Sequence, residues 1–345
     1  GGFSAEAVDL NGDGTVDRAY MGDLYSHIWA FDLSSPKPNH WKPAYGNKPL
    51  FSGMTEEEDA HTQPITVRPL VTMPPRAVTK WFPDALGVPV DGPSSGALKL
   101  AKTGDGEVAT VRGATGVSSV GGKLGGNGLM VYFGTGRLID TEDRTLKYKQ
   151  YYYGIHDRGI PDRGTEHLVR QRFLSDGSAC SESADADSGP CGRVTDSDLR
   201  VDYSRKSGWY IPLPEEGERV IHRSLVRRGM ILFTSVVPSQ SVCETGGQGW
   251  EMVVKMDNGG SPKDALYDAD RDGVVRSDDG MLIDTGKGEP ERIGLAGRKL
   301  RAGLPAGSVM FKDRRYTPTS GDDTDKVVAD GGSIKYTGTE GCVPP

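Results

Sequence analysis

Residues 18–32 read RAYMGDLYSHIWAFD, and this stretch predicts a β-hairpin. Tyr20 lies in a short first strand, Gly22 begins the turn, and Ile28 to Phe31 form a strongly apolar second strand. Short apolar runs bounded by Asp, Asn or Gly read as strands, because these residues supply the turn geometries. Similar runs return at residues 129–133, 150–155, 230–237 and 250–256. The sequence therefore predicts an all-β fold.

The repeated theme of an apolar strand, then Phe-Asp or Met-Asp, then a turn is similar to the blade unit of quinoprotein-type propellers. We expect one domain over residues 1–345, a modified β-propeller, partial or complete, with long loop insertions. About four blade-like units fit, fewer than the commoner closed rings need. We therefore expect that the upstream blades are missing and come from the upstream segment of its own precursor or from another polypeptide. Surface loops are expected at 34–63, 91–127 and 312–332.

Composition narrows the classes of function. The chain has 345 residues, with 48 Gly, 22 Pro and a net charge of −7. An acidic chain has no general electrostatic reason to bind nucleic acid, but it does attract cations. No apolar run reaches the roughly 18 residues that a membrane-spanning helix needs.

The acidic loop at residues 9–17, DLNGDGTVD, predicts a calcium site. Oxygen-bearing side chains fall at loop positions 1, 3, 5 and 9, and a glycine at position 6 allows the sharp turn of an EF-hand. Position 12 is Tyr20 rather than the usual Glu, and a strand follows, so this is an EF-hand-like loop on a β scaffold. The alternative is an Asp/Gly-rich turn. The predicted ligands are Asp9, Asn11, Asp13, Asp17 and the carbonyl of Thr15.

A second acidic loop, at residues 268–279, is closer to the EF-hand pattern and looks like a dockerin loop. It is expected to belong to an inserted calcium-loop segment at 264–284. Arg276 at position 9 departs from the pattern, and a water molecule can take that place. An exposed acidic turn is the alternative. The predicted ligands are Asp268, Asp270, Asp272, Asp279 and the carbonyl of Val274.

The cysteines and the calcium loops together favour a location outside the cytoplasm. The four cysteines predict two disulfides, Cys180–Cys191 and Cys243–Cys342, in preference to four free thiols in a reducing compartment. Calcium at extracellular concentration fills even weak loops, and each ion adds its binding energy to folding.

Motifs of the common enzyme classes are missing from the sequence. There is no Gly-x-Ser-x-Gly, no His-Glu-x-x-His and no phosphate-binding Gly-x-x-x-x-Gly-Lys, and the six histidines are scattered. No Cys/His spacing suggests zinc. We expect no catalytic residues and a chain that is not an enzyme.

Three stretches together resemble the C-terminal propeller of the PilC/PilY family of type IV pilus tip proteins. They are DLNGDGTVDRAYMGDLYSHIWAFDL (9–33), VYFGTGRLI (131–139) with QYYYGIHD (150–157), and GWYIPLPEEGERVIHRSLVRRGMILFTSVVP (208–238). The resemblance implies a modified propeller whose functional calcium loop is the loop at residues 9–17. It also implies a calcium-dependent pilus-tip adhesin or pilus biogenesis factor acting in surface attachment and in pilus extension and retraction. No Arg-Gly-Asp is present, so integrin-type adhesion is not supported.

The same resemblance implies partners and a location. The partners would be minor pilins at the pilus tip and a host or abiotic surface, and the chain would be exported through the periplasm to the bacterial cell surface or pilus tip. Two other readings stay open: a quinoprotein-like propeller dehydrogenase, and a structural subunit of another extracellular assembly.

Overall fold

The strands of the chain are short, and they pack as two compact units. The computed structural model describes residues 4–53, 63–75, 78, 99–103, 106–110, 128–161, 164–180, 191–239, 246–269, 274–286, 288–300, 303–311, 314–320, 326–328 and 333–335. The first unit comprises Gly1–Gly136, Tyr152–Val169 and Val201–Tyr210, and the second comprises Arg137–Tyr151, Arg170–Arg200 and Ile211–Pro345. The 3₁₀ helices are η1 (Pro38–His40), η2 (Thr141–Thr145), η3 (Thr165–His167) and η5 (Ser277–Asp279).

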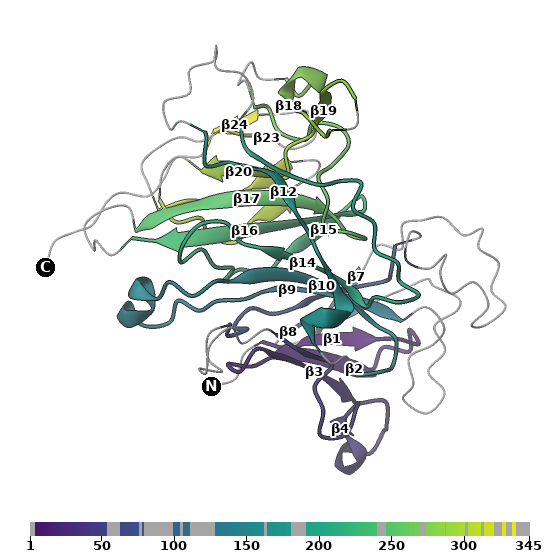
Figure 1. Ribbon diagram of the computed structural model, residues 1–345. Helices are drawn as coiled ribbons and strands as arrows, with labels where there is room; N and C mark the ends of the chain where they lie inside the picture. Colours follow the sequence, from purple (N-terminus) through teal and green to yellow (C-terminus); the bar gives the residue numbers. More distant parts are fainter. Residues whose placement is uncertain are drawn as a thin grey trace, which may run out of the picture. The chain divides into compact units, whose positions relative to one another are not determined.

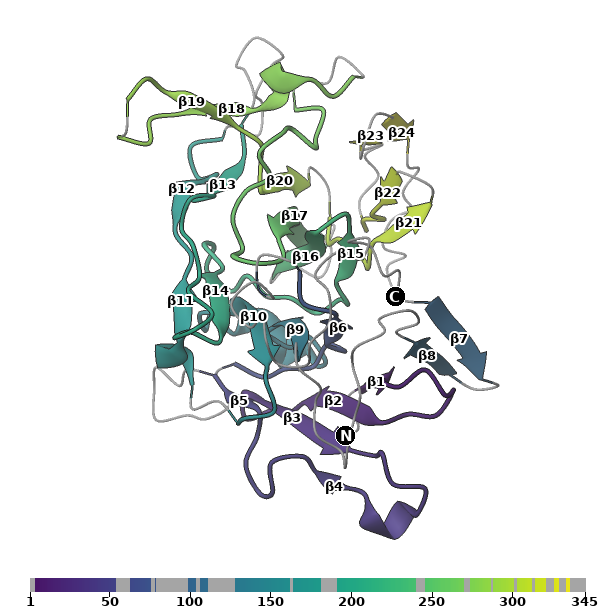
Figure 2. The same ribbon diagram turned by 90° about the vertical axis from the view of Figure 1, so that its right-hand side faces the viewer.

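The first unit contains a sheet in the order β4-β3-β2-β1-β8-β7, with β5 also paired to β3. Its pairs are antiparallel except β1 with β8, which run parallel with Val8 opposite Ala109 and Asp9 opposite Thr110. Figure 1 shows β1, β2 and β3 side by side, and Figure 2 shows β7 and β8 beyond β1. The strands are β1 (Glu6–Asp9), β2 (Arg18–Gly22), β3 (His27–Asp32), β4 (Lys42–Pro43), β5 (Phe51–Ser52), β7 (Lys99–Thr103) and β8 (Gly106–Thr110).

A second sheet of the first unit has the order β11-β14-β10-β9-β6. Every residue of β9 and β10 is buried, including the polar His156 and Asp157 at the end of β10. The rings of Phe51, Phe133 and Tyr153 pack together with centroids 4.9–5.8 Å apart. The strands are β6 (Leu70–Thr72), β9 (Leu129–Gly134), β10 (Tyr151–Asp157), β11 (Leu168–Arg170) and β14 (Gly208–Pro212).

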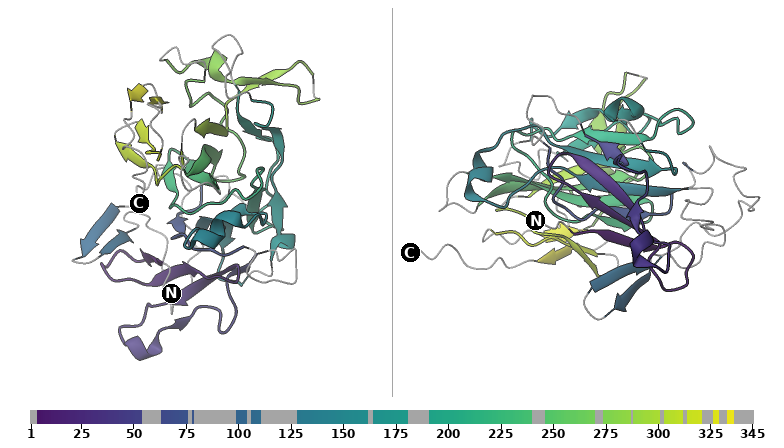
Figure 3. Two further views of the ribbon diagram at one scale, coloured as in Figure 1. Left: turned by 90° about the vertical axis from the view of Figure 1, so that its left-hand side faces the viewer. Right: turned by 90° about the horizontal axis from the view of Figure 1, so that it is seen from below.

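The second unit contains a sheet in the order β12-β13-β20-β17-β16-β15 and three separate two-stranded sheets. The long pair β16–β17 carries the core residues Phe233, Trp250 and Met252. Figure 3 shows the β18–β19 hairpin reaching away from that sheet. The strands are β12 (Phe173–Asp176), β13 (Arg193–Thr195), β15 (Leu225–Arg227), β16 (Met230–Pro238), β17 (Gly247–Lys255), β18 (Met281–Ile283), β19 (Glu291–Ile293), β20 (Gly297–Leu300), β21 (Val309–Phe311), β22 (Arg314–Tyr316), β23 (Lys326–Val328) and β24 (Ser333–Lys335).

The predicted all-β fold and the hairpin at 18–32 are confirmed: β2 and β3 pair antiparallel. The sheets of the described residues are open, and the closed propeller ring is not confirmed. Part of the expected loop at 91–127 is instead a hairpin, β7 with β8. The sequences of these strands, KLAKT and GEVAT, contain the β-branched residues Thr and Val, which favour a strand. That preference is weak until a neighbouring strand is present to pair with.

Candidate functional site

The loop at residues 9–17 connects β1 to β2, and neighbouring strands hold both of its ends. β1 ends at Asp9 and β2 begins at Arg18. The N–H of Asp17 donates to the carbonyl of Val8 at 2.9 Å, so the loop closes on itself where it leaves the sheet. Gly14, at the sixth position, has φ +94°, a left-handed conformation that glycine adopts without strain. This is the sharp turn that the EF-hand pattern predicts.

The first and last predicted ligands of this loop point inward. Asp9 accepts the N–H groups of Gly12 and Gly14 at 2.7 and 2.8 Å through its two carboxylate oxygens. Asp17 Oδ2 accepts the N–H of Leu10 at 2.8 Å. Asp9 is 1% exposed and Asp17 5%. These carboxylates thus lie inside the curve of the loop rather than in solvent.

Asn11 and Asp13 complete the cluster. The Asn11 amide nitrogen Nδ2 donates to Asp13 Oδ2 at 3.1 Å and to Asp17 Oδ1 at 3.5 Å. Thr15 donates its N–H and its hydroxyl to Asp13 Oδ1 at 2.7 and 2.6 Å. The structure therefore brings four predicted side chains together, with Thr15 beside them.

The electrostatics of the loop are those of crowded negative charge. Burial, together with the nearby carboxylates of Asp13 and Asp9, raises the pKa of Asp17, although the N–H groups of Leu10 and Asn11 act to lower it. The hydroxyl and N–H of Thr15 lower the pKa of Asp13. Like charges held this close repel one another, and a bound cation would remove that repulsion.

The donor set fits calcium chemically. Carboxylate, amide and carbonyl oxygens on alternate residues are the ligands that Ca²⁺ takes, six to eight at a time in proteins generally. Among the described residues, no group of three or more His, Cys, Asp or Glu side chains has its oxygen, nitrogen or sulfur atoms arranged to hold a metal ion. In the first loop the carboxylate oxygens face N–H donors instead.

The second acidic loop is described in part. Asp268 and Asp279 are buried, Val274 is exposed, and Asp270 and Asp272 lie outside the described residues. Asp279 accepts the N–H of Ala269 at 2.5 Å and that of Arg276 at 2.7 Å, so one carboxylate ties the two ends of the loop together.

One buried ionic cluster of the first unit was missed by sequence reasoning. Arg18 pairs with Asp157 at 2.9 Å, and Tyr20 donates its hydroxyl to the same carboxylate at 2.6 Å. Tyr45 also donates its hydroxyl to Asp157. Burial, together with the Asp157 charge, raises the pKa of Tyr20 well above its usual value, so the hydroxyl stays protonated. A signal existed in the sequence: two charged residues at the ends of apolar strands.

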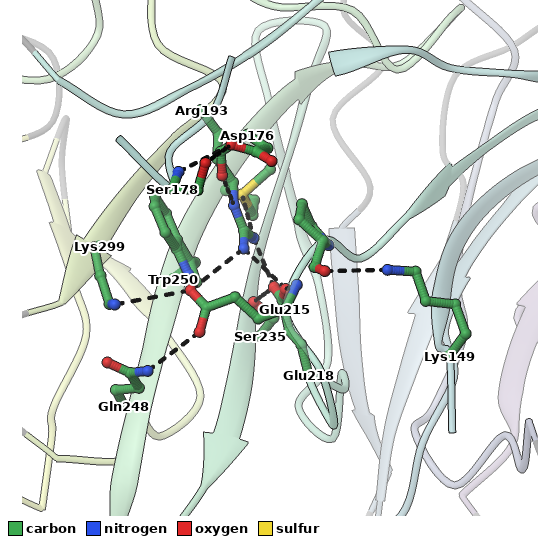
Figure 4. Close-up of polar contacts among 12 residues, drawn as sticks. Lys149, Asp176, Ser178, Arg193, Glu215, Glu218, Ser235, Gln248, Trp250 and Lys299 are labelled. Carbon is green, nitrogen blue, oxygen red and sulfur yellow. Dashed lines mark hydrogen bonds and ion pairs between the residues drawn. The ribbon is translucent and has the colours of Figure 1, made fainter. Parts of the chain in front are cut away.

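A second buried cluster, in the second unit, was also missed (Figure 4). Arg193 makes two hydrogen bonds to Glu218, at 2.6 and 2.9 Å, and its guanidinium lies 3.8 Å from the Trp250 ring centre. The Cys180–Cys191 disulfide is present as predicted, and Cys191 lies two residues before Arg193 in the sequence. The other predicted pair, Cys243 and Cys342, lies outside the described residues.

The chain is thus an all-β protein with open sheets and with an acidic loop of EF-hand-like spacing between β1 and β2. No protein-family model matches the chain. The type IV pilus biogenesis factor PilY1 homolog of Xylella fastidiosa is 28% identical over 265 residues, covering 74% of this chain and 14% of that protein. Type IV pilus biogenesis factor PilY1 of Pseudomonas aeruginosa strain PAO1 is 24% identical over 309 residues, covering 79% of this chain and 22% of that protein.

The crystal structure of the Pseudomonas aeruginosa PilY1 C-terminal domain has the same fold. It superposes with a TM-score of 0.59 at 17% identity, covering 94% of this chain and 60% of that one. The predicted resemblance to the PilC/PilY family is thereby confirmed: the chain is similar in sequence to PilY1 proteins and in fold to the PilY1 C-terminal domain. It spans between 14% and 22% of the length of these curated relatives. In the part of the chain that the structure describes, no helix has the length and apolarity to cross a membrane.

Proposed function

We propose that the chain is a calcium-binding part of a type IV pilus biogenesis factor. On this proposal it acts at the pilus tip in surface attachment and in pilus extension and retraction. The observation that carries the calcium proposal is the convergence of Asp9, Asn11, Asp13 and Asp17 on one loop with a left-handed glycine. The pilus proposal is supported by the names of the relatives.

The proposed ligands of the first loop are the four converging side chains and the carbonyl of Thr15. Filling the loop with Ca²⁺ would tie β1 to β2 and neutralise its carboxylates, and the binding energy would add to the stability of the first unit. The second loop is proposed as a further calcium site, with Asp268, Asp270, Asp272, Asp279 and the Val274 carbonyl as ligands.

The partners proposed are minor pilins and the surface to which the cell attaches, and the location is the cell surface or pilus tip. The Cys180–Cys191 disulfide supports this location, because disulfides form and persist in oxidising compartments.

Calorimetric titration with calcium tests the first site. Asp13→Ala removes an oxygen that no neighbour replaces, so one binding event should disappear. Asp202→Ala is the matched control, because Asp202 also accepts its contacts from a residue two positions on, Ser204, but lies outside both acidic loops. A titration of Asp13→Ala with the same stoichiometry as the control variant rejects calcium binding at this loop.

The pilus role is tested in cells. In a bacterium whose own biogenesis factor of this type is deleted, the full-length protein containing this domain should restore surface pili, and its Asp13→Ala variant should change extension or retraction. Full restoration of pili and motility by the variant would separate pilus assembly from calcium binding.

A further inference from the structure

Arg18, Tyr20, Tyr45 and Asp157 form a buried cluster, here called the anchor cluster, and its Arg18 directly follows the first acidic loop in the sequence. Arg18 is 2% exposed and Asp157 is fully buried. The Asp157 carboxylate accepts hydrogen bonds from Arg18, Tyr20, Tyr45 and the N–H of Gly159. Arg18 also donates from Nε to the Tyr20 hydroxyl at 2.8 Å, and its guanidinium lies over the rings of Tyr20 and Tyr45, 5.5 and 5.2 Å from their centres. This carboxylate is thus held by four donors.

The cluster is joined to the loop by a single peptide bond. Asp17 is the last proposed ligand, and Arg18 follows it at once. The backbone of Asp17 is held on both sides, because its N–H donates to Val8 at 2.9 Å and its carbonyl accepts the N–H of Leu33 at 2.8 Å. In extended backbone, successive side chains point to opposite faces. Asp17 therefore turns into the loop while Arg18 turns into the cluster.

We propose that the anchor cluster positions Asp17 for calcium, with Asp157 and Tyr45 as positioning residues that set the affinity of the first loop. This inference rests on the proposed calcium binding by that loop. Calcium takes its oxygen ligands within a narrow range of about 2.3–2.6 Å, so a ligand on a loosely held strand end binds less well. Groups that hydrogen-bond directly to metal ligands typically change metal affinity by about 10–100-fold when they are altered, and the anchor cluster acts through the neighbouring Arg18, so we expect the lower end of that range.

The alternative is that the anchor cluster only stabilises the fold and has no effect on calcium binding. A buried ion pair is weak evidence for stability, because removing both charges from water costs much of what their attraction returns. A structural role would lower thermal stability equally with and without calcium. A positioning role would in addition weaken calcium binding by the folded protein and shrink the rise in melting temperature that calcium produces.

The test uses Tyr45→Phe, which removes one hydroxyl from the cluster and leaves the ring in place. Asp157→Asn is the second variant. Tyr25→Phe is the matched control, because Tyr25 is 52% exposed in the turn between β2 and β3 and its hydroxyl is not part of the cluster. All variants carry Asp272→Ala, so that calorimetry with calcium titrates the first loop. Melting is followed in EDTA and in calcium.

We expect calcium affinity about tenfold weaker in Tyr45→Phe than in Tyr25→Phe, with unchanged stoichiometry. Affinities of Tyr45→Phe and Tyr25→Phe within twofold of each other overturn the inference, and this comparison decides the case if Asp157→Asn does not fold. If the protein with Asp272→Ala alone binds no calcium, the proposed function fails first and the inference falls with it. If all variants bind calcium with the same affinity, the inference is wrong but the proposed calcium binding by the first loop stands.

Discussion

Replacing Glu218 by alanine removes the carboxylate that neutralises Arg193 in the second unit. Both side chains are fully buried, and two hydrogen bonds of 2.6 and 2.9 Å join them. Ser235 donates its hydroxyl to the same carboxylate, and the N–H of Glu215 donates to it at 3.0 Å. The substitution thus leaves a buried guanidinium without its main partner and two donors without their acceptor (Figure 4).

The expected loss of stability is the balance of two effects. Removing one partner of a buried ion pair typically costs about 3–5 kcal/mol. The Trp250 ring lies 3.8 Å from the guanidinium in the wild type already, so this contact does not change the difference in stability. Glu215 Oε1, 3.8 Å from Arg193 and partly exposed, can move closer and offset part of the loss. We therefore expect the free energy of unfolding to fall by about 3 kcal/mol.

Urea denaturation followed by tryptophan fluorescence measures this loss, with each unit fitted as its own transition where two are seen. Glu216→Ala is the matched control two residues away: Glu216 is exposed, pairs with exposed Lys147 at 3.1 Å, and should lose no more than about 1 kcal/mol. The double change Arg193→Met with Glu218→Leu should recover much of the loss. If the free energies of unfolding of Glu218→Ala and Glu216→Ala differ by less than about 1 kcal/mol, the reasoning is wrong.

Three further outcomes are expected. Cys180→Ser should lower the free energy of unfolding by about 3 kcal/mol under oxidising conditions, which is the chain-entropy value for a loop of this size. In reductant, where the wild-type disulfide is also broken, the variant and the wild type should be equally stable. Gly177→Ala should lower the melting temperature, because Gly177 has φ +81° and an added Cβ would lie 2.3 Å from the Trp250 ring; an unchanged melting temperature would show that the turn adapts. Burial alone would raise the pKa of Asp143, but two backbone N–H groups and Arg137 lower it, so its contribution is full above about pH 4 and is lost as the pH falls through the folded pKa. Asp143→Asn should accordingly be less stable than wild type at pH 7, with the difference shrinking in acid urea titrations.

The strands that sequence reasoning placed well are those whose signal is local. The hairpin at 18–32 has apolar runs and a turn within fifteen residues, and β2 and β3 follow it closely. β17 was predicted to begin at Trp250 but begins at Gly247. Glycine has low strand propensity, yet Gly247 and Gly249 lie opposite Pro238 and Val236 of β16, and this pairing extends the strand. The strand propensities of single residues do not show which strand will lie next to them.

The same contrast separates the acidic loop from the buried ion pairs. The four converging side chains of the first loop lie within nine residues of one another, so their spacing already indicates their chemistry. Arg18 and Asp157 are 139 residues apart, and Arg193 and Glu218 are 25 apart. Their pairing depends on which strands become neighbours, and a single sequence does not state that.

The partners of the buried carboxylates also bear on the calcium proposal. Arginine side chains meet the buried carboxylates of Glu6, Asp157, Glu218 and Glu251. Asp9 and Asp17 are as deeply buried, but within the described residues they accept backbone and amide N–H groups, and the charges that act on Asp17 are those of two other carboxylates. Burying charge is costly unless an opposite charge compensates it. At those four carboxylates the fold supplies the opposite charge from its own arginines, and in the first acidic loop a divalent cation would supply it.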